Sequence, residues 1–160
     1  MLEKPAIPDG LIASELQAGY DIKSVQIEFL PLGADVNTAV YKVVSTTGET
    51  YFLKIRRGNF DPLSVLLPRY LSDQGIAQII PPLLTRNQQS WARLESYILI
   101  LFPFVDGWDG YRVNLTDLHW QEFGSALCRI HTMHPPLAIT DRMGRETFRP
   151  HYRQVVEDYL

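Results

Sequence analysis

The amino-acid sequence lacks most features that mark secreted, membrane-spanning or disulfide-bonded proteins. Its 160 residues include a single cysteine, Cys128, which excludes an internal disulfide and fits a reducing compartment. The longest apolar run, residues 97–105, is too short to span a bilayer and is interrupted by Pro103. The first residues include Glu3 and Pro5, where a signal peptide would have a basic start and an apolar centre. We therefore expect a cytoplasmic protein with no membrane segment.

Concentrated positive charge and metal-ligand clusters are also scarce. The net charge is −3 and no basic run exceeds Arg56–Arg57, so neither nucleic acid nor a membrane surface is an expected partner. His119, His131 and His134 have no cysteine or carboxylate at ligand spacing, and we expect no metal site there. With 46% apolar residues, the chain can bury the core of about one globular domain. Cys128 is expected to be a small buried side chain on a helix.

What the sequence does contain is a polar turn followed by a strand that carries one lysine. In the turn, Gly33 to Thr38, backbone N–H groups can approach phosphate oxygens because glycine leaves room. The strand, residues 50–55, has Lys54 among apolar and aromatic side chains, so this lysine must reach water or meet an anion. This order of loop, strand, turn and lysine-bearing strand is typical of kinase nucleotide sites. An ordinary hairpin with an exposed lysine remains the alternative, because only one glycine is present.

The turn departs from the three-glycine pattern of kinase loops. The positions that correspond to the three glycines and the following valine are Gly33, Asp35, Thr38 and Val40. The first glycine and the valine are kept. Polar residues replace the other two glycines, and these can hydrogen-bond to phosphate or to the backbone.

Periodicity and turn signals predict an α+β chain with five strands. Residues 24–56 should form a three-stranded antiparallel meander, followed by a helix with Asp61 as N-cap and Gly75 as C-cap. Pro68 leaves open whether this is one kinked helix over 62–74 or a turn before a second helix start. The other expected elements are a helix at 10–19, strands at 79–84 and 91–102 joined by a turn at 87–90, a connector at 101–107, and helices at 115–131 and from 152 onward.

Apolar spacing predicts which faces of these elements are buried. Val25, Ile27 and Phe29 alternate with polar residues and should face the core of the sheet. Thr116 is expected to cap the helix at 115–131. The apolar stripe of that helix comprises Trp120, Phe123, Leu127 and Ile130.

Five strings of the sequence follow one another in a familiar order. They are LPLGADVNTAVYKV at the loop, YFLKIRRGNFD at the lysine strand, PRYLSDQGI at the next helix, ILFPFVDG at the connector and WQEFGSALCRIHT at the following helix. The chain thereby resembles the aminoglycoside phosphotransferase family of kinase-like small-molecule kinases, and most closely its spectinomycin phosphotransferase-like branch. The resemblance implies a protein-kinase-like N-terminal lobe over residues 1–105, then a hinge and the start of a helical C-terminal lobe over 106–160.

The resemblance also implies ATP- or GTP-dependent transfer of the terminal phosphoryl group to a hydroxyl of an aminoglycoside or aminocyclitol, with Mg²⁺. Lys54 would hold the α- and β-phosphates and Val40 would cover the base. The carbonyl of Pro103 and the N–H of Val105 would read the edge of the base. The residues implied as nucleotide-binding are Gly33, Asp35, Asn37, Thr38, Val40, Lys54, Asp61, Pro103, Phe104 and Val105, the first four of them over the phosphates.

Two parts of the family's pattern are missing. Kinases orient the lysine with a helix glutamate, but none occurs between Asp61 and Gly75, so Asp61 or, as an alternative, Asp73 would replace it. The catalytic loop, His-Gly-Asp followed by an asparagine, occurs nowhere in the chain. We therefore expect no catalytic residue and no activity of this chain alone, with the base and the Mg²⁺ ligands beyond Leu160. The periodic segment from Tyr152 has no cap at its end, which also predicts the front part of a longer protein.

The expected partner is a small-molecule substrate, a hydroxylated cation, and the full-length protein is expected to be a monomer. Four acidic residues could line the substrate site, although acidic side chains are mostly solvated surface charges: Asp141, Glu146, Glu157 and Asp158. Two other interpretations stay open. One is a kinase of choline, homoserine or a sugar, and the other is a non-catalytic nucleotide-binding or interaction module.

Overall fold

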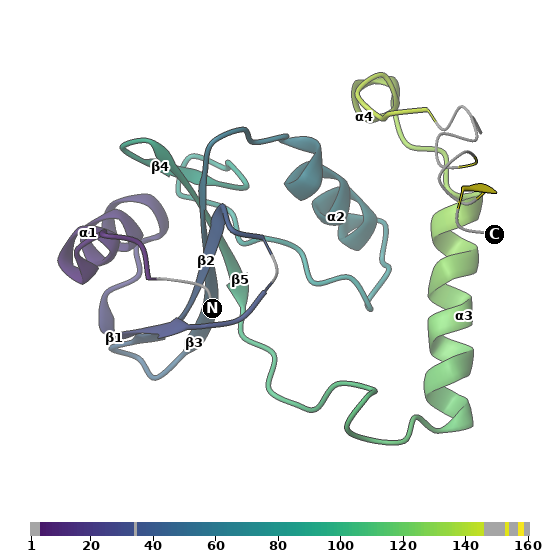
Figure 1. The fold of residues 1–160 in the computed structure, drawn as a ribbon, viewed down its shortest axis with the longest axis horizontal. Coiled ribbons are helices and arrows are strands. Elements are labelled where there is room, and N and C mark those ends of the chain that lie inside the picture. Colours follow the sequence, from purple (N-terminus) through teal and green to yellow (C-terminus); the bar gives the residue numbers. More distant parts are fainter. Residues whose placement is uncertain (1–3, 34, 146–152, 154–156, 159–160) are drawn as a thin grey trace.

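The chain folds into a sheet-containing lobe that a long connector joins to a separate helix (Figure 1). The structure, a computed structural model, describes residues 4–33, 35–145, 153 and 157–158. Two helices belong to the sheet lobe, α1 (Asp9–Tyr20) and α2 (Leu63–Asp73). The third helix, α3 (Asp117–Thr132), follows the connector and is itself followed by the short α4 (Leu137–Thr140).

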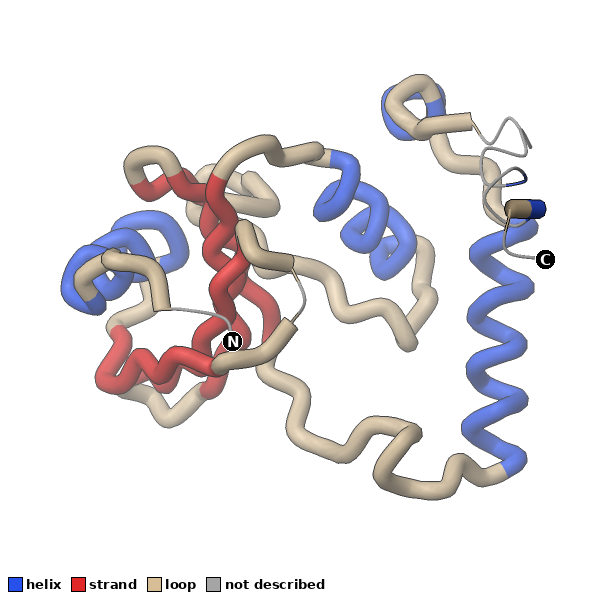
Figure 2. Tube along the Cα trace, in the orientation of Figure 1, coloured by secondary structure: helices blue, strands red, loops and turns tan. Residues whose placement is uncertain are grey.

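The sheet has five strands in the order β1-β2-β3-β5-β4, and all neighbouring strands are antiparallel (Figure 2). The strands are β1 (Ser24–Leu30), β2 (Thr38–Ser45), β3 (Thr50–Arg57), β4 (Ala92–Leu94) and β5 (Tyr97–Pro103). The predicted meander, the total of five strands and the helix inserted after the third strand are confirmed, although the last two strands lie at other residues than predicted. β3 lies at the centre, with hydrogen-bonded partners on both edges.

Alternation along β3 separates a face covered by α1 from a face that carries the lysine. Leu53 and Ile55 are buried in the main core, together with Ile12 and Leu16 of α1. Lys54 stands between Leu53 and Ile55 in the sequence and therefore points to the opposite face of the sheet. The amphipathic helix predicted at 10–19 is thus confirmed, because it provides the apolar cover for one face of the sheet.

The helix α2 packs on the face of the sheet that carries the lysine. Its Val65 is buried against Ile98 and Ile100 of β5. The helix continues through Pro68, which settles the alternative in favour of one helix. The chain leaves α2 through Gly75 at φ +83°, a conformation that glycine adopts without strain.

The hairpin before the connector differs from the prediction. β4 and all of β5 except Pro103 lie within the single strand predicted at 91–102, and a two-residue turn at Glu95 separates them. Residues 79–84 form no strand, because Pro81 and Pro82 have no N–H to donate to a ladder. This segment keeps one backbone bond to the sheet, from the N–H of Leu83 to the carbonyl of Leu101 at 2.7 Å.

Val25 and Cys128 were predicted to be buried and are exposed. Val25 is 64% exposed, because the pairing of β1 with β2 shifts register between Ser24 and Gln26 and leaves Val25 outside the alternation. Cys128 is exposed as well. Its helix meets the rest of the described chain along a narrow strip in which Ala126 is the buried residue, and Cys128 lies outside that strip.

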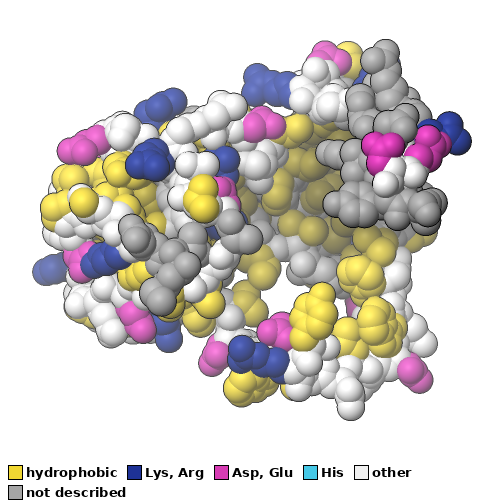
Figure 3. All heavy atoms as spheres, in the orientation of Figure 1, with side chains coloured by type: hydrophobic (Ala, Val, Ile, Leu, Met, Phe, Trp, Pro, Cys, Tyr) yellow, Lys and Arg dark blue, Asp and Glu magenta, His cyan; other side chains and the backbone are white. Residues whose placement is uncertain are grey.

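The helix α3 begins at the predicted cap and docks against the end of α2. The hydroxyl of Thr116 accepts from the N–H of His119, and Nδ1 of His119 accepts from the N–H of Thr116 at 3.0 Å. Ala126 packs with Leu71 and Ile76 in a small apolar cluster. Most of the predicted apolar stripe remains uncovered within the described chain, and Figure 3 shows hydrophobic side chains exposed over the connector and the first turns of α3.

Other expectations concern metals, membranes and the end of the chain. No group of three or more potential metal ligands occurs among the described residues. None of the helices within the described ranges has the length and apolarity needed to cross a membrane. The helix predicted from residue 152 onward falls almost wholly outside the described residues.

Candidate nucleotide-binding site

A cavity of about 440 Å³ lies on the lysine-bearing face of the sheet. Its walls come from four separate parts of the chain: the end of β1 and the residues after it, the middle of β3, the segment after α2, and the end of β5 with the connector. The lining residues are Leu30, Leu32, Phe52, Lys54, Ile80, Phe102, Pro103, Phe104 and Val105. The volume is in the range of small-molecule sites, and the lining is apolar apart from one cation and the backbone of the connector.

Lys54 occupies the centre of this face because the register of three strands places it there. It pairs with Val40 of β2 on one side and with Ile100 of β5 on the other. Its ammonium Nζ lies 5.8 Å from the centre of the Phe102 ring. No ion pair joins Lys54 to any other described residue, so its charge is available to an anion in the cavity.

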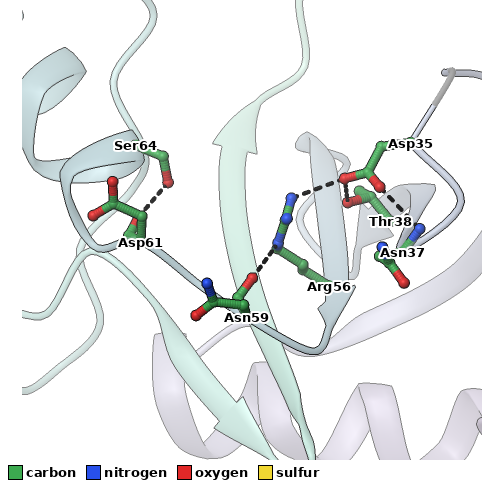
Figure 4. A network of polar contacts seen from close by, with 7 residues as sticks. All are labelled: Asp35, Asn37, Thr38, Arg56, Asn59, Asp61 and Ser64. Atoms are coloured by element: carbon green, nitrogen blue, oxygen red, sulfur yellow. Dashed lines mark hydrogen bonds and ion pairs between the residues drawn. The ribbon is translucent and has the colours of Figure 1, made fainter. Parts of the chain in front are cut away.

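The turn between β1 and β2 is held in shape by one carboxylate, that of Asp35 (Figure 4). This carboxylate accepts from the N–H of Asn37 at 2.9 Å, from the hydroxyl of Thr38 at 2.8 Å and from Arg56 Nη1 at 2.8 Å. The backbone bond from Asn37 is the largest of the causes that lower the pKa of Asp35. Gly33 enters the turn at φ +99°, a conformation strained for other residues. The polar residues at two glycine positions of the kinase pattern therefore bond to the turn itself.

The connector after β5 is fixed to the sheet at Phe104. The N–H of Phe104 donates to the carbonyl of Thr50 at 3.2 Å, and the ammonium of Lys42 lies 4.8 Å from the centre of the Phe104 ring. Val105 is 62% exposed, and no described residue accepts from its N–H. The N–H of Val105 is therefore available to a ligand, whereas that of Phe104 is not.

Neither aspartate considered as the partner of Lys54 is bonded to it. The carboxylate of Asp61 accepts from the N–H of Leu63 at 2.9 Å, in the first turn of α2. Asp73 forms an ion pair with Arg69 at 2.8 Å. The assignment of Asp61 as the orienting carboxylate stays a prediction.

Three of the four acidic residues considered for the substrate site are described by the structure, and none of these three lines the cavity. Asp141 is exposed after α4, and Glu157 forms an ion pair with Arg153 at 3.3 Å. Asp158 is exposed, and Glu146 lies outside the described residues.

Of the residues predicted to bind a nucleotide, four line the cavity, namely Lys54, Pro103, Phe104 and Val105. The others do not line it: Gly33, Asp35, Asn37, Thr38, Val40 and Asp61. Sequence reasoning also missed Arg56. The Arg56 side chain bonds to the carboxylate that shapes the turn. The alternation of side chains along a strand could have indicated that it lies on the same face as Lys54. Arg56 follows Lys54 by two positions, so both side chains project from the same face of β3.

A second cavity of about 500 Å³ lies beside the turn. It is lined in part by Lys4, Asn37, Arg57 and Tyr97, and contains neither Lys54 nor any residue of the connector. It therefore lacks the combination that distinguishes the first cavity.

Comparison with known proteins supports the kinase-like interpretation. No family model and no curated protein matches the sequence. The fold matches that of spectinomycin phosphotransferase APH(9)-Ia in complex with ADP and spectinomycin, with a TM-score of 0.87 and 28% identity over 98% of this chain. The AMP-bound complex of the same enzyme matches with a TM-score of 0.80 and 26% identity over 94% of the chain.

A third structure shares the fold at a greater distance. Amicoumacin kinase hAmiN, solved in complex with AMP-PNP, Ca²⁺ and Ami, matches over 96% of this chain with a TM-score of 0.57 and 20% identity. The chain spans about half the length of these enzymes, namely 47%, 45% and 48% of the three structures. The predicted resemblance to aminoglycoside phosphotransferases and the predicted kinase-like fold are both confirmed.

Proposed function

We propose that this chain is the nucleotide-binding portion of an ATP- or GTP-dependent kinase that phosphorylates a hydroxyl of an aminoglycoside or aminocyclitol such as spectinomycin. The cavity that joins Lys54 to the connector carries this proposal. Lys54 provides a cation that has no ion-pair partner among the described residues, and the connector provides an N–H that no described residue accepts from. These are the two features that a nucleotide needs, one for its phosphates and one for its base.

The apolar walls of the cavity fit the flat faces of a purine. Phe52 and Phe102 are paired across β3 and β5, and the carbonyl of Pro103 and the N–H of Val105 would bind the edge of the base. Lys54 would then bind the α- and β-phosphates. Its ammonium provides three donors, and bonds between charged groups are stronger than neutral ones.

The turn over the phosphates would contribute backbone N–H groups more than side chains. The carboxylate of Asp35 is engaged within the turn and carries the same charge sign as a phosphate. We therefore assign Asp35 a role in shaping the turn, with Gly33 providing the close approach. Val40 is buried at the start of β2, opposite Lys54 in the adjacent strand, and would cover the base.

Mg²⁺ fits this proposal as a partner of the nucleotide, since it bridges phosphate oxygens in kinases. The His-Gly-Asp string is absent from the sequence. We therefore assign nucleotide binding to this chain, and assign the proton acceptor and the Mg²⁺ ligands to residues outside it. The acceptor hydroxyl would also be bound largely outside this chain.

The first experiment is calorimetric titration of the chain with ATP, GTP and adenosine in the presence of Mg²⁺. Binding of a nucleoside triphosphate that exceeds binding of adenosine is the expected result, because the phosphates add contacts to Lys54. Absence of binding by a chain that melts cooperatively would contradict the proposal and would favour a non-catalytic interaction module.

The second experiment tests the acceptor with the full-length protein. Product mass would be measured after incubation with Mg²⁺ and ATP or GTP, against spectinomycin, other aminoglycosides, choline and homoserine. A phosphorylated product from spectinomycin is expected. Turnover of choline or homoserine alone would overturn the assignment of the acceptor and leave the assignment of nucleotide binding in place.

A further inference from the structure

We infer that Arg56 couples the turn over the phosphates to helix α2, and thereby provides the connection that a lysine–glutamate ion pair provides in protein kinases. The inference rests on the proposed nucleotide site, and it adds a positioning residue to that site. It is derived from the polar contacts drawn in Figure 4.

Arg56 reaches in two directions from the end of β3. It pairs with Thr38 in the ladder between β2 and β3, so it starts directly beside the turn. Its Nη1 donates to the carboxylate of Asp35 at 2.8 Å, and its Nε donates to the carbonyl of Asn59 at 3.0 Å. Because the guanidinium is planar and rigid, one side chain holds both partners at a fixed separation.

Each of the two partners is itself tied to a larger element. On one side, Asp35 also accepts from the N–H of Asn37 and from the hydroxyl of Thr38, so the turn is folded around this carboxylate. On the other side, Asn59 lies two residues before Asp61, whose carboxylate accepts from the first N–H of α2 and whose carbonyl accepts from the hydroxyl of Ser64. A continuous path of bonds and short backbone segments therefore runs from the turn to the first turn of α2.

The ion pair that joins the sheet lysine to the helix in protein kinases has no counterpart among the described residues. The helix α2, residues 63–73, contains no glutamate, and its Asp73 is paired with Arg69. Lys54 is not paired with any carboxylate among the described residues. A polar connection runs instead from Arg56, two residues further along β3, to Asn59 in the segment before α2. Lys54 is thereby left to contact the phosphates.

The ion pair acts on geometry more than on stability. The side chains of Arg56 and Asp35 are 37% and 43% exposed, and ion pairs with this much contact to water contribute little to folding. The pair also places a positive charge next to a carboxylate that would otherwise repel the phosphates. Arg56 therefore matters for the affinity of the phosphorylated ligand and for the order of α2.

The test compares Arg56→Met with the matched control Arg57→Met. Arg57 is the next residue, is exposed and forms no ion pair with a described residue, while its backbone N–H donates to Asn37 in either variant. Amide hydrogen exchange would be followed without nucleotide at Asn37 and Thr38 in the turn and at Leu63 and Ser64 in α2. Titrations with ATP and with adenosine would be carried out on the same variants.

Arg56→Met should accelerate exchange at both the turn and the start of α2 by about threefold or more, while Arg57→Met should change neither. Its ATP affinity should fall about 5- to 10-fold, with adenosine affinity within about twofold of wild type. Arg56→Lys should not restore α2 protection, because a single ammonium cannot span both partners. The melting temperature of Arg56→Met should stay within about 3 °C of wild type.

The hydrogen-exchange measurements and the nucleotide titrations can each contradict the inference independently. Unchanged exchange at Leu63 and Ser64 in Arg56→Met would overturn the coupling, whatever the nucleotide result. Equal loss of ATP and adenosine affinity would also overturn it, because the residue would then act on the whole cavity. If the wild-type chain binds neither ligand, the proposed function fails, and the exchange data still decide whether Arg56 couples the turn to the helix.

Discussion

Replacing Lys54 by methionine is the sharpest test of the nucleotide site. Methionine keeps much of the apolar stem of the lysine and removes the ammonium that lies over the Phe102 ring. Because Lys54 has no ion-pair partner among the described residues, this change leaves no carboxylate unpaired in the folded chain. The loss of affinity should therefore report the contact with the ligand and not a disturbed protein network.

The expected magnitude follows from the value of one hydrogen bond to a charged group. Such bonds contribute about 1.5 to 3 kcal/mol, and about 1.4 kcal/mol corresponds to a tenfold change in affinity. Lys54→Met should therefore weaken ATP binding by about 10- to 150-fold. Adenosine has no phosphates, and its affinity should change by less than about twofold.

Lys42→Met is the matched control for this measurement. Lys42 points to the same face of the sheet but lies over the Phe104 ring in the connector, away from the turn. Its replacement should reduce ATP and adenosine affinity to a similar, smaller extent. Calorimetry gives both affinities, and circular dichroism confirms that each variant is folded. An unchanged ATP affinity in folded Lys54→Met, or equal losses for ATP and adenosine, would remove Lys54 from the phosphate site.

Three further predictions concern stability and association. Burial raises the pKa of Tyr41 to about 12 from an ordinary 10.0, so the folded state keeps a proton that the unfolded state releases. The stability that depends on this proton is fully present below pH 10 and is lost as the pH rises from 10 to 12. Urea midpoints should therefore fall over that range, less steeply in Tyr41→Phe. Gly75→Ala should destabilise the chain by about 1 kcal/mol because Gly75 has φ +83°, whereas Gly10→Ala at the start of α1 should not destabilise it. Thermal melts would compare the two variants, and equal effects would contradict the conformational explanation. The exposed apolar side chains of α3, including Trp120 and Phe123, should make the chain self-associate, and Phe123→Gln should reduce this in sedimentation; a monodisperse wild-type monomer would refute the expectation.

Local sequence signals were sufficient for much of the sheet lobe because its elements are contiguous in the chain. The meander has strands of alternating apolar residues separated by short turns, and both the strand order and the side on which Lys54 projects follow from that pattern. The start of α3 was equally local, because Thr116 caps it through residues three positions away.

The predictions of secondary structure were wrong where one local sequence pattern is compatible with more than one structure. The apolar run at 79–84 looks like a strand, but its two prolines remove the donors that a ladder requires. The run at 91–102 can be one long strand or a tight hairpin, and the left-handed conformation of Glu95 decides for the hairpin. Val25 was misplaced because an irregularity in pairing cannot be deduced from alternation alone.

The candidate site was predictable only in part. Some of its residues are marked by local sequence, whereas the contacts of others form only when distant segments meet in the fold. Lys54 stands out as a lone charge in an apolar strand, and the connector as a proline-containing end of a strand. The bonds of Arg56 depend on where the turn and the segment before α2 meet in space. Sequence spacing gives the face on which Arg56 lies and does not give its partners.

The alternation of apolar and charged side chains along β3 also disfavours pairing of this strand in the wrong register. A slip of one residue would bring Lys54 beneath α1 and turn Leu53 and Ile55 out of the core. The slipped sheet would lose about 1.5 to 3 kcal/mol for each aliphatic side chain exposed, in addition to the cost of burying an unpaired ammonium. Because β3 has partners on both edges, the penalty would apply to two ladders at once. The lysine that is suited to hold a phosphate thus also excludes the misregistered sheet during folding.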